Sequence, residues 1–127
     1  MIKWCSRELI TGPYLALCTT EKDFHKALKK LGVPVADWSH WIDPDAHART
    51  HALTAKGKFC CIVCIEANPE GILPAQIVAL LAHEAVHVKQ KYMEFIGECD
   101  PSPEFEAYVV QNIVQELVLA YPYEEEV

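Results

Sequence analysis

Three short segments of the chain have the hydrophobic patterns of β-strands. Residues 58–65 read Lys-Phe-Cys-Cys-Ile-Val-Cys-Ile, and such a continuous apolar run predicts a buried strand. Residues 14–18 form a second apolar run between turn-forming residues, and residues 49–54 form a third segment of strand character. The tripeptide at residues 55–57, which ends in glycine, separates the third segment from the first and predicts a β-hairpin.

Three longer segments have the periodicity and boundary residues of helices. Residues 20–31 place apolar side chains three or four positions apart, and a glycine and a proline follow them. A second helix is expected from residue 74 to residue 92 or 95, with Gly97 marking its end, and a third over residues 103–120. Strand, helix, two strands and two helices in this order are typical of an α+β domain. We expect one domain over residues 1–127, with a three-stranded sheet packed against the last two helices.

Composition and charge narrow the classes of function. Half of the residues (51%) are hydrophobic, which is enough for a core, and the net charge is -7 with no basic stripe. Nucleic-acid binding is therefore disfavoured. The first residues pass quickly into polar sequence, without the apolar run of a secretion signal or membrane anchor. We expect a cytoplasmic protein with no membrane partner, and an acidic frayed tail over residues 124–127.

Six cysteines raise the question of disulfides or a metal knuckle. In a cytoplasmic protein the expected state is the reduced thiol. Cys61 and Cys64 form a C-x-x-C pair, but no second such pair exists, and both lie within the predicted strand of residues 58–65. We therefore expect structural cysteines that act as small apolar residues.

The motif His-Glu-Ala-Val-His lies in the middle of the second predicted helix. His83 and His87 are four residues apart, which places both imidazoles on one side of a helix, where they can bind one metal ion. Glu84 lies about 100° around the axis, beside such a metal rather than on it. Ten of the eleven residues over 72–82 are apolar or proline, so the motif follows a helical segment suited to burial. The pattern is typical of zinc hydrolases, with the carboxylate taking a proton from water.

Two histidines leave such a site incomplete, because catalytic zinc usually has three protein ligands and one open position. The start of the last helix offers two carboxylates in the segment Glu104-Phe105-Glu106-Ala107-Tyr108. The preceding loop can bring this first turn against the helix that carries the histidines.

With the H-E-x-x-H motif and this glutamate-containing segment on the next helix, the chain resembles the gluzincin branch of zinc metallopeptidases. In that branch a Glu on the helix after H-E-x-x-H is the third zinc ligand. The chain is also similar to small predicted zinc peptidases encoded in phages and prophages, in which a similar Glu-Phe-Glu-Ala-Tyr segment follows the motif. The resemblance covers residues 77–111 and implies a minimal zincin-like domain. It implies that His83 and His87 bind Zn²⁺ and that Glu84 is the general base.

The resemblance favours Glu104 as the third ligand and leaves Glu106 as the alternative. Gluzincins often have a small residue three positions after the ligand, as Ala107 follows Glu104, although the spacing from the histidines suits Glu106 better. Some gluzincins have an Asp four positions after the ligand, where this chain has Tyr108. Tyr108 can donate a hydrogen bond to a developing oxyanion, as a catalytic residue, or simply be a half-buried aromatic residue.

The resulting hypothesis is a zinc metallopeptidase that acts on a peptide or protein substrate, with residues 59–65 as an edge strand for an extended peptide. The alternative is a catalytically silent zinc-binding interaction module of phage or prophage origin. In that case the zinc is structural, Cys99 or His40 is a candidate fourth ligand, and the surface around Trp38 and Trp41 binds a partner.

Overall fold

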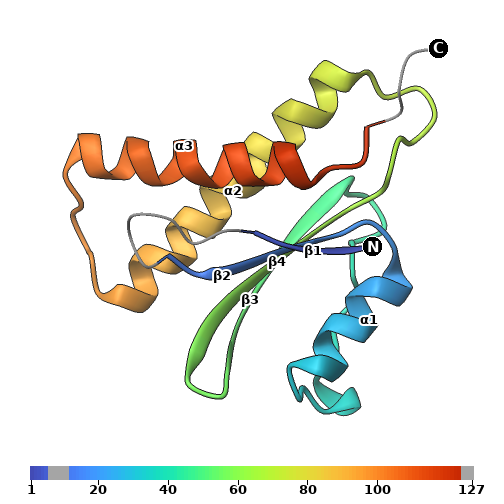
Figure 1. Cartoon of the computed structure of the whole chain (residues 1–127), viewed down its shortest axis with the longest axis horizontal. Coiled ribbons are helices and arrows are strands. Elements are labelled where there is room, and N and C mark those ends of the chain that lie inside the picture. Colours follow the sequence, from blue (N-terminus) through green and yellow to red (C-terminus); the bar gives the residue numbers. More distant parts are fainter. Residues whose placement is uncertain (6–11, 124–127) are drawn as a thin grey trace.

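The computed structural model describes residues 1–5 and 12–123, and it has an α+β architecture (Figure 1). The predicted acidic tail over residues 124–127 lies outside the described residues. The elements in chain order are β1 (Ile2–Trp4), β2 (Tyr14–Cys18), α1 (Glu21–Lys30), the short 3-10 helix η1 (Val35–Asp37), β3 (Ala48–Ala55), β4 (Lys58–Ile65), α2 (Pro74–Ile96) and α3 (Pro103–Ala120).

The described strands form one mixed sheet with the order β1-β2-β4-β3. β2 pairs with β4 in parallel, and the outer pairs β1–β2 and β3–β4 are antiparallel. The three predicted strands are confirmed, but the prediction of a three-stranded sheet is wrong because β1 adds a fourth strand. β1 has three residues and is mostly exposed, so it lacks the apolar pattern that would predict it.

The prediction that residues 59–65 form an edge strand is also wrong. β4 lies between β2 and β3, and its residues from Cys60 to Ile65 are all buried. A continuous apolar run is typical of a strand that is covered on both faces and paired on both sides. The edge of the sheet on this side is β3, where buried and more exposed residues are interspersed.

Helices cover both faces of the sheet (Figure 1). On one face, α1 buries Phe24, Ala27 and Leu28 against Ile62 and Cys64. On the other face, α2 and α3 bury a larger cluster that includes Leu17, Val63, Leu81, Val88 and Leu117. The alternation of side chains along β4 supplies both clusters, because successive residues point to opposite faces.

The helix boundaries follow the expected chemistry. Thr20 caps α1 by accepting a hydrogen bond from the backbone N–H of Asp23 at 3.0 Å, and Ser102 caps α3 by accepting one from Phe105 at 3.4 Å. α2 ends at Gly97, whose φ of 77° is the left-handed conformation that glycine adopts at little cost. No helix in the described ranges combines the length and apolar character needed to cross a membrane.

All six cysteines, which lie within the described ranges, are free thiols. Cys61 belongs to the core on the α2 side of the sheet, whereas Cys64 belongs to the core on the α1 side. Burial raises the pKa of Cys61 to about 12 and that of Cys18 to about 11, so both stay protonated at neutral pH. Cys61 and Cys64 are thus buried as small apolar residues of the two cores, as the strand pattern predicts.

Candidate metal centre

The two histidines of the motif lie on the exposed side of α2, one turn apart. Leu81, Ala85 and Val88 turn the opposite side of the helix into the core, which leaves His83 and His87 at the surface. Their Nε2 atoms are 3.2 Å apart. Two nitrogens that each lie about 2.0–2.1 Å from one tetrahedral zinc ion are about 3.3 Å apart. The pair therefore fits two corners of a tetrahedral metal site.

Gln90 orients one of these imidazoles. His87 Nδ1 is 3.1 Å from Gln90 Oε1, and an amide oxygen can only accept, so Nδ1 carries the proton. His87 Nε2 then carries no proton, so its lone pair accepts from the Nε2–H of His83 at 3.2 Å and is the atom that a metal would engage once His83 loses that proton. Metal-binding histidines commonly donate their second ring N–H in this way, which fixes the tautomer that binds metal.

Glu84 is buried beside the histidines and held by the neighbouring edge strand. It is 6% exposed, and its Oε2 accepts a hydrogen bond of 2.5 Å from the hydroxyl of Thr50 on β3. No buried side-chain oxygen or nitrogen within the described ranges lacks a hydrogen-bond partner. Because Oε1 has no partner among these residues, it reaches solvent rather than being sealed in the core. The carboxylate is thus fixed through one oxygen and open through the other.

A cavity of about 320 Å³ lies over these three residues. Besides His83, Glu84 and His87, it is lined by residues of β3 and of the loop before it, and by one lysine further along α2. These residues are Asp43, Ala48, Arg49, Thr50 and Lys91. The site therefore lies where α2, the edge strand β3 and the loop before β3 meet.

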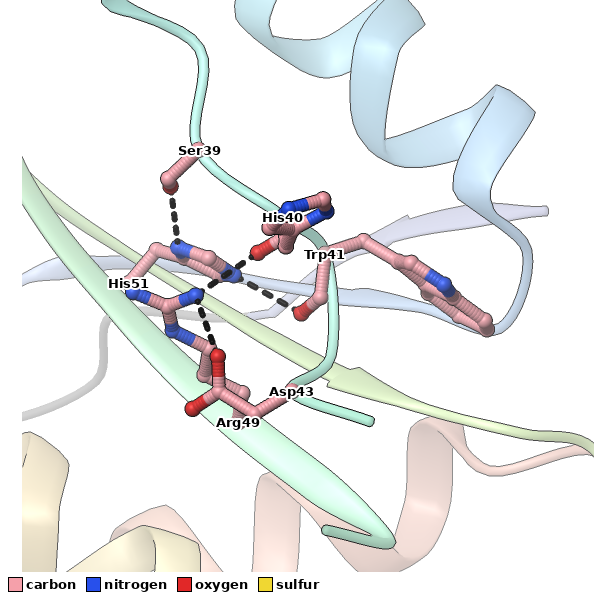
Figure 2. Close-up of polar contacts among 6 residues, drawn as sticks. All are labelled: Ser39, His40, Trp41, Asp43, Arg49 and His51. Atoms are coloured by element: carbon pink, nitrogen blue, oxygen red, sulfur yellow. Dashed lines mark hydrogen bonds and ion pairs between the residues drawn. The ribbon is translucent and has the colours of Figure 1, made fainter. Parts of the chain in front are cut away.

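The loop is tied to β3 by side-chain hydrogen bonds. Figure 2 shows residues 39–43, here called the strap, beside β3. Arg49 Nη1 donates to the carbonyl oxygen of His40 at 2.9 Å and to Asp43 Oδ1 at 3.1 Å. His51 Nε2 donates to the carbonyl oxygen of Trp41 at 2.9 Å, and its Nδ1 accepts from the hydroxyl of Ser39 at 3.3 Å. These four contacts fix one wall of the cavity.

His51 is a structural residue rather than a metal ligand. Both of its ring nitrogens are engaged with the strap, and the ring stacks on Phe24 with a centroid distance of 4.4 Å. Burial lowers its pKa below the usual value, so it is neutral at pH 7 and can accept from Ser39. Trp38 and Trp41 are partly buried and pack against the core on the α1 side.

α3 lies on another flank of α2. Glu106 Oε1 is 3.5 Å from Lys89 Nζ, and Lys89 lies about 200° around the helix axis from His87. Glu104 is exposed on the first turn of α3, and Tyr108 is 57% exposed. None of the three lines the cavity over the histidines.

The structure thus brings together His83, Glu84 and His87 but adds no predicted third ligand. Among residues 1–5 and 12–123, no group of three or more His, Cys, Asp or Glu side chains is placed to hold a metal ion. The donor pair fits a metal, and the third ligand remains a prediction.

The residues that surround the motif were not predicted from the sequence. Gln90 has a local signal, because it lies one turn after His87 on the same helix. Asp43, Arg49 and Thr50 have none, because only the packing of β3 and the strap against α2 brings them to the motif.

Comparisons with known proteins identify no relative. No family model matches the chain, and neither a curated protein nor a solved structure matches it.

Proposed function

We propose that this chain is a zinc-dependent hydrolase, and specifically a peptidase, with His83 and His87 as metal ligands and Glu84 as general base. The observation that carries the proposal is the geometry of the motif. Two imidazole nitrogens 3.2 Å apart share one cavity with a carboxylate that has one oxygen held and the other open. A zincin-like fold is part of the same proposal.

Each residue has a distinct task in this scheme. His83 and His87 would hold the zinc ion, which would act as a Lewis acid on a carbonyl group and lower the pKa of a bound water. Thr50 holds Glu84 Oε2, which leaves Oε1 to take the proton of the attacking water. Glu84 then returns that proton to the leaving amine.

The edge strand supports a peptide as the substrate. β3 is at the end of the described sheet, and its residues Arg49 and Thr50 line the cavity. An unpaired strand edge can bind an extended peptide through backbone hydrogen bonds. This role replaces the one that the sequence suggested for residues 59–65.

The first test is the metal content of the purified protein after zinc is supplied and the excess removed. We expect about one zinc per chain in the wild type, because the motif forms a single site. His83→Ala and His87→Ala should each weaken zinc binding by more than about 100-fold, which exceeds the usual effect of losing an outer-shell partner. His47→Ala is the matched control, since His47 is exposed and outside the cavity. A metal-free wild type, or equal binding by all variants, contradicts the proposal.

Substitution of Gln90 should have a smaller effect on zinc affinity than substitution of either histidine. Gln90→Ala should weaken zinc affinity by about 10-fold, because His87 loses the acceptor that fixes its metal-binding tautomer. Alanine preserves the helix, so unfolding temperature should change little. Gln115→Ala, at an exposed position of α3, should leave zinc affinity unchanged. Zinc titration of both variants checks this, and equal affinities would mean that Gln90 does not orient His87.

A further inference from the structure

The structure leaves a zinc ion at His83 and His87 one protein ligand short, and the two carboxylates of α3 do not line the cavity. Besides Glu84, one more carboxylate does line it. Asp43 of the strap lines the same cavity as both histidines, on the side formed by β3.

The backbone of Asp43 is held in place independently of any metal. Its carbonyl oxygen accepts from the N–H of Ala46 at 2.9 Å, which closes a β-turn with Pro44 at the position that proline favours. The strap is also anchored to β3 through His51 and Arg49. β3 in turn is hydrogen-bonded to α2 through Thr50 and Glu84. This chain of contacts links the strap to the helix that carries the histidines.

The carboxylate of Asp43 is only half engaged. Oδ1 accepts from Arg49 Nη1 at 3.1 Å, while Oδ2 accepts no hydrogen bond from the described residues. The side chain is 62% exposed, so it can rotate without displacing the core. A ligand carboxylate in a metal site is usually held in this way, by a donor on one oxygen while the other binds the metal.

We propose that Asp43 is the third protein ligand of the metal, with Arg49 as the residue that positions it. The inference rests on the proposed function and deepens it, because it names the ligand set as His83, His87 and Asp43. The assignment requires the Asp43 side chain to rotate, because these three described residues are not placed to hold a metal ion as they stand. It would leave the fourth position of a tetrahedral site open. The set draws on α2 and the strap, and it leaves α3 with a purely structural role beside the site.

Zinc affinity, measured by competition with a chelating dye, tests this assignment. Asp43→Asn should weaken zinc binding by about 100-fold or more, since it removes the charge of a direct ligand. Asp45→Asn removes the same charge two residues away, at an exposed position outside the cavity, and should bind as the wild type does. Glu104→Gln and Glu106→Gln should also bind as the wild type does.

A loosened strap is a competing explanation for weak binding by Asp43→Asn, and Arg49→Gln separates the two. That variant removes both strap contacts of Arg49 but keeps the Asp43 carboxylate, so it should lose much less zinc affinity than Asp43→Asn. Equal losses in these two variants would overturn the ligand assignment. Wild-type affinity in Asp43→Asn, or loss in Glu104→Gln or Glu106→Gln, would also overturn it. In those cases the proposed function stands as long as His83→Ala abolishes binding, whereas a wild type that binds no zinc ends both proposals.

Discussion

Glu84→Gln is expected to lower peptide hydrolysis by about 10²- to 10⁴-fold while zinc stays bound. The size is that of a general base whose proton transfer is lost. Glutamine keeps the shape of the side chain, and its amide oxygen can still accept the hydrogen bond from Thr50, so the fold should persist. Retention of metal follows because Glu84 lies beside the two imidazoles and is not one of the proposed ligands.

The measurement is cleavage of a fluorogenic peptide library by zinc-loaded protein, with zinc content determined on the same samples. Glu98→Gln is the matched control, since Glu98 is exposed in the loop after α2 and outside the cavity. Hydrolysis at the wild-type rate by Glu84→Gln would remove Glu84 as the base. A wild type that binds zinc but cleaves no peptide would instead favour the interaction module as the role of the site.

Leu81→Ala should give the largest loss of stability, a decrease of about 3–5 kcal/mol in the free energy of unfolding. Leu81 is fully buried, at 0% exposure, in the core that joins the sheet to α2 and α3. Truncation removes apolar contacts and leaves a cavity that a close-packed core only partly fills. The loss is a large share of the roughly 5–15 kcal/mol that stabilises a typical domain.

Thermal and denaturant unfolding of Leu81→Ala and Leu119→Ala measure this effect. Leu119 is 73% exposed on α3, so the same change there should alter the unfolding free energy by less than about 0.5 kcal/mol. The contrast tests whether the face of α2 opposite the histidines carries the core. Similar losses in the two variants would contradict the packing of α2 described above.

The helices and three of the strands could be predicted because their signals are local. The apolar run of β4 and the capping residues of α1 and α3 specify their own conformations. β1 could not be predicted in this way, because a three-residue exposed strand exists only through its pairing with β2. The central position of β4 could not be predicted either, because it depends on the pairing of β4 with β2 and β3.

In the candidate site, too, the local relations could be predicted from the sequence and the contacts between distant segments could not. The sequence by itself determined the relation of His83, Glu84 and His87, because positions one and four residues apart on a helix have a known angular relation. Only the tertiary structure decided what surrounds them. Thr50 reaches Glu84 across 34 positions of the chain, and Asp43 enters the cavity because Arg49 and His51 hold the strap to β3. Contacts between distant segments depend on how sheet and helices pack, and no local pattern in the sequence encodes them.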